Sequence, residues 1–135
     1  MAKTTGVGIT TFSIDDSGGT PRDIRNDIGA FGISQPRAVQ DVTALDNAGM
    51  DRLLLLADVA LDLDVFFNAA ANRSHDVFKT VLTTDVARTN SIGFGGVAFA
   101  PEIKFTDYNI TRDNGGALTI KCPGVLTGGA VPAWT

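Results

Sequence analysis

The segment from residue 59 to residue 67, VALDLDVFF, alternates between two kinds of side chain with a period of two. One side of the alternation is wholly apolar, with Val59, Leu61, Leu63, Val65 and Phe67. The other side carries two acids, with Ala60, Asp62, Asp64 and Phe66. Only an extended strand places alternate residues on opposite faces. The segment therefore predicts a β-strand with one core face and one acidic face.

Composition agrees with a β-rich chain of one domain. The 135 residues suit a single core, and an apolar content of 44% is enough to fill it. Fifteen glycines, few aromatic residues and many β-branched residues in short segments are typical of strands joined by tight turns. We therefore expect one mainly β domain over residues 1–135.

Other strands and turns follow from local patterns. We expect extended segments over residues 9–14, 28–35, 37–45, 86–94, 102–112 and 117–121. Pro36 has no N–H for a ladder and favours a strand boundary between the second and third of these. Glycine-rich clusters at residues 15–20 and 113–116 predict turns. Arms are expected at about residues 1–8 and about residues 123–135, because the Gly and Pro spacing of the second stretch argues against a long regular element.

A projecting loop and a short helix complete the expected organisation. The polar stretch over residues 45–52 contains Gly49 and predicts a loop, while residues 48–57 fit either a strand or a short helix by composition. Farther on, Asn68, Asn72 and Ser74 are candidate N-caps, and Asp76 suits a first helical turn. The spacing of Val77, Phe78 and Val81 predicts the buried stripe of a short helix that packs on the sheet.

Charge and sequence signals exclude several classes. The net charge is −4 and the basic residues are scattered, which disfavours direct DNA binding. The start of the chain has no signal-peptide pattern and no stretch long enough to span a bilayer, so we expect synthesis in a cytoplasm and no membrane association. Cys122 is the only cysteine, so no intramolecular disulfide can form.

The acidic strand and the single histidine invite a catalytic interpretation. Asp62 and Asp64 would lie on one strand face, where like charges can raise a pKa, but no neighbouring motif supplies a nucleophile or a metal. No Cys/His spacing near His75 or Cys122 is typical of a zinc or haem site. We therefore expect no enzymatic activity, no metal and no cofactor.

A resemblance to a known family runs over nearly the whole chain. The segments SIDDSGGTPRDIRNDI, PRAVQDVTALDNAGMDRLLLLADVALDLDVFFN, NRSHDVFKTV and FTDYNITRDNGGALTIKCPGVLTGGAVPAW occur in this order. Together they resemble the major tail tube proteins of long, non-contractile-tailed bacteriophages. The order of the segments is more specific than any one of them.

The resemblance implies a fold and an assembly. It implies a small β-sandwich or barrel-like domain with one flanking helix, whose inner strands join into a continuous β-barrel within a hexameric ring. Stacked rings would form a virion tail tube around a tape-measure protein, with a tail terminator at one end and a baseplate or initiator at the other. DNA would pass through the lumen without specific binding. The bottom-up pattern agrees, because exposed strand edges need partners and ring closure supplies them.

The tail tube hypothesis gives roles to two groups of residues. A ring-stacking loop is expected at the centre of the polar stretch, with Asp46, Asn47, Ala48, Gly49 and Met50. Asp62 and Asp64 are candidates for the lumen, although strand alternation alone leaves the tube exterior open as an alternative. Two other classes remain: a β-rich adhesion or carbohydrate-binding module, and a small enzyme on a β-barrel. The first requires an exposed aromatic platform, for which Tyr108 and Trp134 offer little material.

Overall fold

The computed structural model describes residues 9–135, and over these residues the chain forms short strands and one helix. In chain order the elements are β1 (Thr11–Asp15), β2 (Pro21–Asp23), β3 (Ile28–Ser34), β4 (Arg37–Asp41), β5 (Arg52–Ala57), β6 (Ala60–Phe66), α1 (Ser74–Phe78), β7 (Arg88–Phe94), β8 (Val97–Phe99), β9 (Glu102–Phe105), β10 (Asn109–Arg112) and β11 (Leu118–Leu126). The mainly β class with one short helix is confirmed.

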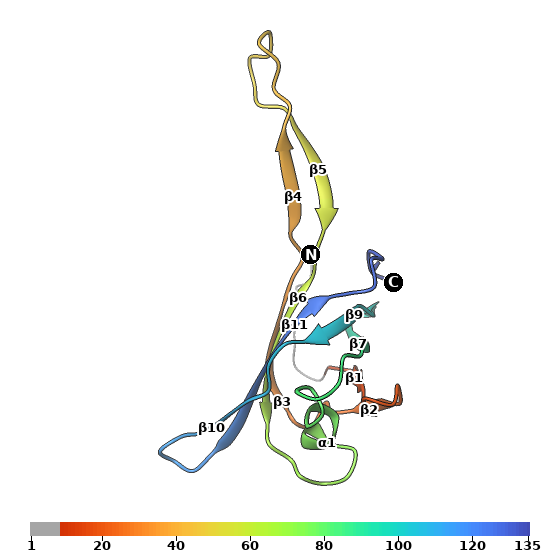
Figure 1. Cartoon of the computed structure of the whole chain (residues 1–135), viewed down its shortest axis with the longest axis vertical. Coiled ribbons are helices and arrows are strands. Elements are labelled where there is room, and N and C mark those ends of the chain that lie inside the picture. Colours follow the sequence, from red (N-terminus) through yellow and green to blue (C-terminus); the bar gives the residue numbers. More distant parts are fainter. Residues whose placement is uncertain (1–8) are drawn as a thin grey trace.

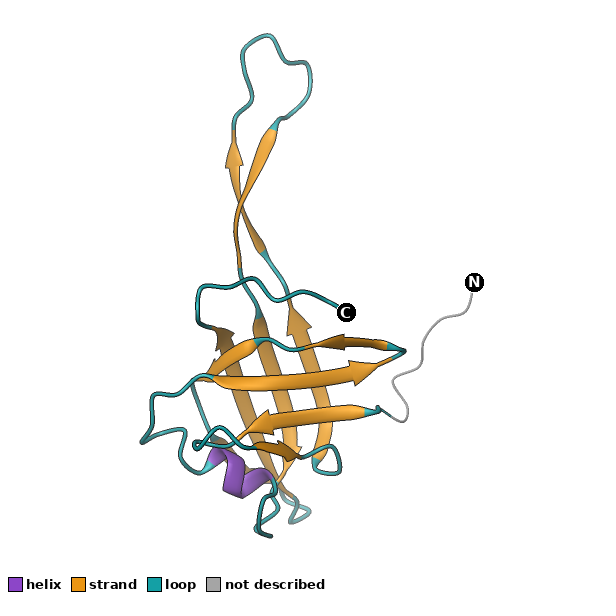
Figure 2. Cartoon of the chain, turned by 90° about the vertical axis from the view of Figure 1, so that its right-hand side faces the viewer, coloured by secondary structure: helices purple, strands orange, loops and turns teal. Residues whose placement is uncertain are grey.

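Nine of the described strands belong to one sheet that bends into two layers. The strand order is β2-β1-β7-β9-β11-β6-β3, with β10 paired to β11 and β8 paired to β7. In one layer β3, β6 and β11 run along the long axis of the molecule, and in the other β1 and β7 cross them (Figure 2). The remaining strands, β4 and β5, form a separate two-stranded ribbon that projects beyond the body (Figure 1).

The core lies between the two layers. On β6 the exposure alternates as the sequence predicts: Leu61, Leu63 and Val65 are buried, whereas Asp62 and Asp64 are exposed. The crossing layer contributes Phe12, Ile14 and Ile92, and β11 contributes Ile120 and Cys122. The predicted two-faced strand therefore provides one wall of the core.

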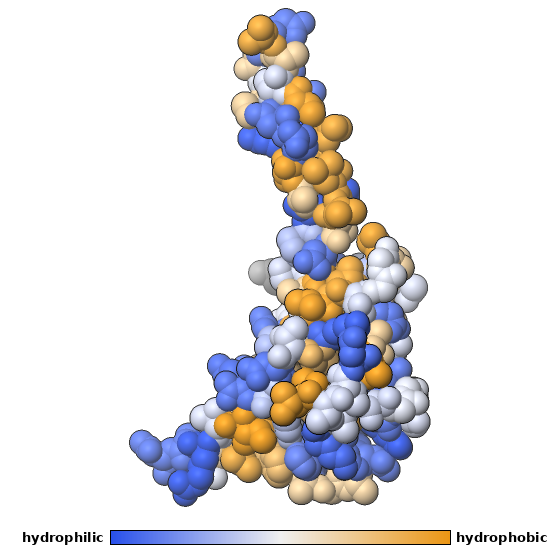
Figure 3. Space-filling view, in the orientation of Figure 1, coloured by the Kyte–Doolittle hydropathy of each residue, from blue (hydrophilic) through white to orange (hydrophobic). Residues whose placement is uncertain are grey.

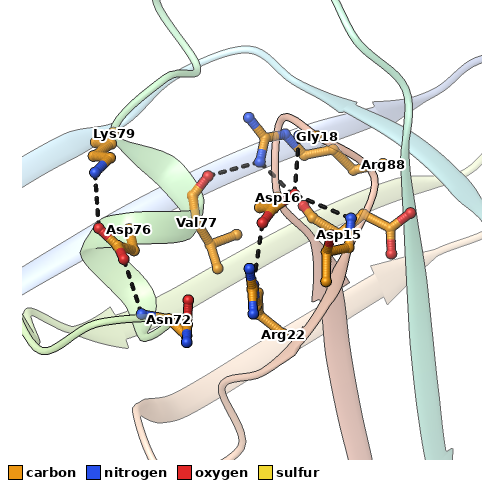
Figure 4. A network of polar contacts seen from close by, with 10 residues as sticks. Asp15, Asp16, Gly18, Arg22, Asn72, Asp76, Val77, Lys79 and Arg88 are labelled. Carbon is orange, nitrogen blue, oxygen red and sulfur yellow. Dashed lines mark hydrogen bonds and ion pairs between the residues drawn. The ribbon is translucent and has the colours of Figure 1, made fainter.

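Helix α1 closes one end of the core and is held there by Arg88. This arginine is only 2% exposed, and its guanidinium Nη1 donates to the carbonyls of Val77 (2.6 Å) and Asp15 (3.1 Å) (Figure 4). Its Nη2 donates to the hydroxyl of Thr80 at 3.1 Å. Burial lowers the pKa of Arg88, and the charges of nearby acids partly offset this effect. Arg88 therefore joins the helix to β1 and β7.

Other polar contacts fix the turns around this helix. The Asp16 carboxylate accepts a hydrogen bond from the backbone N–H of Thr20 and another from Arg22 (Figure 4). These bonds, that of Thr20 foremost, lower the pKa of Asp16. The Asp76 carboxylate accepts a hydrogen bond from the Lys79 amine, and this bond lowers the pKa of Asp76.

The first helical N–H, of Ser74, is bound by the carboxylate of Asp27 at 3.2 Å. The expected N-caps Asn68, Asn72 and Ser74 are wrong, because the N-cap position is Arg73 and Ser74 is already the first helical residue. The carboxylate that binds the Ser74 N–H comes from a residue 47 positions away.

Several boundaries differ from those that the sequence predicts. The strand expected over residues 37–45 ends at Asp41, and β2 and β8 lie outside the expected segments. The stretch 102–112 is divided at residues 106–108 into β9 and β10, and both strands pair with β11. Helix α1 ends at Phe78, so Val81 lies in the following turn. The expected arm over residues 123–135 begins too early, since Pro123–Leu126 continue β11.

Gly124 explains the last difference. A β-carbon at this position would lie 2.4 Å from Cγ2 of Ile103, closer than real contacts allow. The glycine therefore lets β9 pack closely against β11, and its presence does not end the strand.

The predicted N-terminal arm, about residues 1–8, lies outside the described residues. Within residues 9–135, no helix has the length and apolar character that a membrane crossing requires.

Candidate subunit interfaces

The face of the sheet opposite the core is uncovered and carries the predicted acids. Asp62 and Asp64 point away from the core on β6. Their neighbours on β3 are small, because Gly32 pairs with Asp62 and Ala30 pairs with Asp64. The small β3 residues therefore do not cover the two carboxylates, which remain exposed to water on this side.

The neighbouring strand on the other side adds a positive charge. Lys121 of β11 lies opposite Asp64, and Pro123 lies opposite Asp62. The strip formed by Asp62, Asp64 and Lys121 is called the acidic strip below. It carries two acids and one base, so its net charge is −1 per chain. The expected band of like charge therefore also contains a positive charge, which could be placed there only from the β6–β11 register.

The layer that carries the acidic strip consists of β3, β6, β11 and β10. Among the described residues, its two edge strands pair on one side only. β3 pairs only with β6, and β10 pairs only with β11. The backbone N–H and C=O groups on the outer sides of these strands therefore lack strand partners. Free edges of this kind pair readily with another chain.

The β4–β5 ribbon exposes an unusual amount of apolar surface. The side chains of Leu53, Leu54, Leu55 and Leu56 are between 45% and 86% exposed. Burying one leucine side chain stabilises a protein or complex by about 1.5–3 kcal/mol, so this exposure costs a monomer considerable free energy. The sequence shows the apolar run, but only the structure shows that it lies outside the core.

The predicted ring-stacking loop forms the tip of this ribbon. Residues 42–51 connect β4 to β5, and Asp46, Asn47, Ala48, Gly49 and Met50 lie at their centre, all exposed. Within the loop, Thr43 accepts from the N–H of Asp51 and donates to Asp41 at 2.7 Å. The two ends of the loop are therefore tied together, and the tip stands well away from the body (Figure 1).

The C-terminal segment folds back onto the root of the ribbon. The indole of Trp134 stacks on Phe99 with 4.4 Å between ring centroids, and its Nε1 donates to Oε1 of Gln35 at 3.0 Å. Thr135 and Ala98 exchange two backbone hydrogen bonds. This contact joins β8 to the residue that precedes Pro36, where β3 passes into the ribbon.

A cleft opens where the two ends of the bent sheet face each other. It has a volume of about 830 Å³ and lies between β1 and β3. Its apolar lining includes Ile9, Phe12, Ile28 and Phe31, while Arg25 and Asn26 stand at its polar side. The rings of Phe12 and Phe31 meet edge to face, 5.3 Å apart, and form its floor on the core side.

The single histidine belongs to a packing cluster. Nδ1 of His75 lies 2.7 Å from the hydroxyl of Tyr108, and its ring lies 4.8 Å from that of Phe67. Burial raises the pKa of Tyr108 to about 12 and that of Cys122 to about 12. Among the described residues, no group of three His, Cys, Asp or Glu side chains is placed to hold a metal ion.

The helix residues singled out in the sequence contact the core. Val77 and Phe78 are fully buried, and the ring of Phe78 lies edge to face with Phe105 at 5.1 Å. Val81 is half-buried and packs against the same core from the turn after α1. These three residues attach the helix and its following turn to the sheet.

No protein-family model matches the sequence, and no curated protein matches it. Solved structures do match the fold. The first is the tail of an empty gene transfer agent particle, computed with helical refinement in C6 symmetry. The match has a TM-score of 0.76 and 17% sequence identity, and it covers 98% of this chain and 99% of that chain.

A second match is the virion of a native gene transfer agent particle. It has a TM-score of 0.72 and 15% identity, and it covers 98% of this chain and 99% of that chain. Both matches include the projecting ribbon, because almost no part of the chain lies outside them. The chain therefore shares its fold, over 98% of its length, with chains from gene transfer agent particles.

Proposed function

We propose that this chain is the subunit of a phage-like tail tube, in which rings of identical copies stack to form the conduit for DNA. The strongest support is the fold that it shares, over 98% of its length, with a chain from a tail of C6 symmetry. Hexameric rings and a location in the virion tail follow from this proposal. Its partners would be further copies, a tape-measure protein, a terminator and a baseplate or initiator.

The free strand edges support ring closure. In the layer β3-β6-β11-β10 every neighbouring pair is antiparallel, so β3 and β10 run in opposite directions. Pairing β10 of one copy with β3 of the next continues the antiparallel alternation across the seam. Repetition around a closed rotation removes every such edge and gives a continuous β-barrel.

The two-layered body supports a particular orientation of that barrel. The crossing layer and α1 cover the core side of the β3-β6-β11-β10 layer, so this side must face outward in a ring. The uncovered side, with Asp62 and Asp64, would then line the channel. A net negative lining repels the phosphate backbone and favours passage of DNA over binding.

The adhesion alternative gains no support from the aromatic residues. Trp134 is stacked on Phe99, whereas Tyr108 is hydrogen-bonded to His75 and packs near Phe78. The two rings thus belong to separate clusters and do not form one platform. A purely structural role, without catalysis, is part of the proposal.

Electron microscopy of the purified full-length chain tests the proposal directly. We expect rings or tubes with a central channel in negative stain, and sixfold averages from end-on views. Sedimentation should show species far larger than one chain. A chain that remains monomeric at all concentrations, and that binds immobilised glycans, would instead support the adhesion alternative.

A further inference from the structure

The turn between β10 and β11 contains an asparagine that is followed directly by a glycine. Its residues are Asp113, Asn114, Gly115 and Gly116. The chain has seven asparagines, and Asn114 alone has glycine as the next residue. Every other asparagine precedes a residue with a side chain, which hinders contact between the following backbone nitrogen and the asparagine amide. Glycine has no β-carbon, so its nitrogen is accessible and its backbone rotates freely.

Asn114 and Gly115 lie exposed at the tip of a projecting hairpin. The hairpin extends from the lower left of the body (Figure 1), and its tip is hydrophilic surface (Figure 3). The turn is closed by its flanks, since the N–H of Gly116 donates to the carbonyl of Asp113 at 3.1 Å and the N–H of Ala117 donates to the Asp113 carboxylate at 2.9 Å. Within residues 9–135, neither the Asn114 amide nor the Gly115 N–H has a hydrogen-bond partner. The asparagine amide and the glycine nitrogen are thus open to water.

The backbone of the turn leaves room for a change at Gly115. Tight two-residue Asn-Gly turns require a positive φ at both residues. Here neither Asn114 nor Gly115 has a positive φ, which occurs one position later, at Gly116 (88°). A β-carbon on Gly115 would lie 3.4 Å from Oδ1 of Asp113, an ordinary contact. Alanine can therefore replace Gly115 without strain, and Gly115→Ala becomes a matched variant in which only the access to the nitrogen is reduced.

Two charged side chains flank the turn and act in opposite senses. A β-carbon on Gly116 would lie 3.9 Å from Nη2 of Arg112, so the guanidinium is close to the turn. Its positive charge favours loss of a proton from the Gly115 nitrogen. The Asp113 carboxylate, which accepts from the N–H of Ala117, disfavours the same step. The two effects partly cancel, so the rate of attack by this nitrogen depends mainly on the missing side chain of Gly115.

β10 depends on this turn for its position. Its four residues, Asn109–Arg112, are all exposed, and among the described strands β10 pairs only with β11. The type and length of a hairpin turn fix the register of its strands. An additional main-chain carbon in the turn would therefore displace the pairing of Arg112 with Leu118. The ring closure described under the proposed function uses the outer edge of this same strand.

We propose that Asn114 deamidates spontaneously in the folded chain and that the isoaspartate product prevents β10 from closing a ring. The nitrogen of Gly115 attacks Cγ of Asn114 and forms a C–N bond, while the side-chain nitrogen leaves as ammonia with the proton of the attacking N–H. Water then hydrolyses the cyclic imide. Cleavage of its bond to Cγ gives aspartate, whereas cleavage of its bond to the main-chain carbonyl carbon gives isoaspartate and lengthens the main chain by a carbon. The second half of this proposal rests on the proposed function.

Peptide mapping of the full-length chain measures the deamidation. Dilute folded protein is kept at mildly alkaline pH, and trypsin then releases Asn114 in the peptide Asp113–Lys121. We expect this peptide to change into aspartate and isoaspartate forms, which chromatography separates, and the rate to rise with pH because the attacking nitrogen must lose its proton. Asn47 is the internal control, because it is exposed but precedes Ala48, and its peptide Ala38–Arg52 should keep the asparagine amide. Equal loss from both peptides, or no loss from either, would overturn the site.

The Gly115→Ala variant tests the role of the nitrogen. Its fold should match that of the unaltered chain by circular dichroism, and its Asn114 should persist over the same period. Conversion as fast as in the unaltered chain would overturn the attack by the Gly115 nitrogen. The Asn114→Asp variant carries the charge of the products on a main chain of normal length, so it should form rings and tubes as the unaltered chain does.

Sedimentation of an aged sample tests the effect on assembly. After concentration, tubes in the pellet and free chains in the supernatant are mapped separately. We expect the isoaspartate peptide to accumulate in the supernatant, while the aspartate and asparagine peptides divide alike. An equal share of isoaspartate in the two fractions, or an Asn114→Asp variant that fails to assemble, would overturn the effect on ring closure. A fresh unaltered chain that forms no rings would overturn the proposed function together with this effect, whereas the peptide map would still decide the deamidation.

Discussion

Lys121 on β11 lies directly opposite Asp64 on β6, on the face of the sheet that is turned away from the core. The β-carbons of such a cross-strand pair are about 4.5–5.5 Å apart, so a positive charge stands beside that carboxylate. Asp62 has Pro123 in the equivalent position, so no cation lies opposite it on β11. We therefore expect the negative potential of the acidic strip to be strongest at Asp62.

Reversal of this charge tests the lumen assignment. Asp62→Lys with Asp64→Lys changes the strip from −1 to +3 per chain, because two acids become two bases beside Lys121. Tubes should still assemble, since both side chains point away from the core. Particles built with the variant should eject DNA more slowly, and high salt should partly restore the rate because it screens phosphate contacts.

A variant with the same total charge is the control for this experiment. Leu82→Lys, Thr83→Lys and Asp85→Lys together add the same four charges in the exposed turn after α1, with the loss of one surface ion pair to Lys104, and they should leave ejection unchanged. Normal ejection from the strip variant would speak for the tube exterior. Modification of both new amines by a reagent too bulky for the channel would lead to the same conclusion.

Phe78 should be among the residues on which the stability of the domain depends most. Its ring is fully buried against Phe105, so Phe78→Ala should lower the free energy of unfolding by about 3–5 kcal/mol. His75→Ala removes one hydrogen bond to Tyr108 and should cost about 0.5–1.5 kcal/mol. Urea unfolding of both variants measures the difference. A larger loss for His75→Ala would contradict the packing role of α1.

The sequence predicted those features that depend on local pattern. Alternation over residues 59–67 gave the correct faces of β6, and Pro36 marked the boundary between β3 and β4. The helix was expected near Ser74 because apolar spacing and acidic first-turn residues are local signals. Such features need no knowledge of which strand lies beside which.

The sequence could not predict features that depend on distant neighbours. The end of β11 was missed because Gly124 resembles a strand breaker until Ile103 is placed against it. Lys121 entered the acidic strip only through the β6–β11 register. The exposure of Leu53–Leu56 could not be predicted either, because an apolar run predicts a buried segment unless the path of the chain is known.

Removal of the ribbon tip should separate folding from assembly. Deletion of Asp46–Met50 shortens a loop that contacts no core residue, so circular dichroism and the melting temperature should change little. We expect the variant to fail in tube formation, because the acidic tip would no longer reach the next ring. As a control, Gly115→Ser alters the turn between β10 and β11 without shortening it. Normal tubes from the deletion variant would show that the tip makes no essential contact.

Alkaline pH should destabilise the domain. Burial raises the pKa of Cys122 from 9.0 to about 12 and that of Tyr108 from 10.0 to about 12. Above about pH 9 the unfolded chain therefore releases protons that the folded chain retains, so the free energy of unfolding falls as pH rises towards 12. The stabilisation is complete below about pH 9. Urea midpoints at about pH 8, 9.5 and 11 should decrease in that order.

A cysteine variant assigns part of this alkaline effect. In Cys122→Ala only Tyr108 retains a raised pKa, so the decline should begin near about pH 10 and be shallower. The comparison uses the slope against pH, because the smaller side chain also lowers stability at every pH. A midpoint that stays constant between about pH 8 and pH 11 in the unaltered chain would contradict the burial of both groups.

Trp134 should fasten the C-terminal segment to the root of the ribbon. Its indole stacks on Phe99 and donates to Gln35, yet 41% of the residue is exposed, so Trp134→Ala should cost only about 0.5–1.5 kcal/mol of global stability. The local effect should be larger. The N–H of Ala98 is bonded to Thr135, and loss of the indole should release that pairing and speed hydrogen exchange at Ala98. Val131→Ala is the matched control, because Val131 is exposed, and it should leave exchange at Ala98 unchanged. Equal exchange rates in the Trp134 variant and the unaltered chain would mean that the backbone pair holds the segment without the ring.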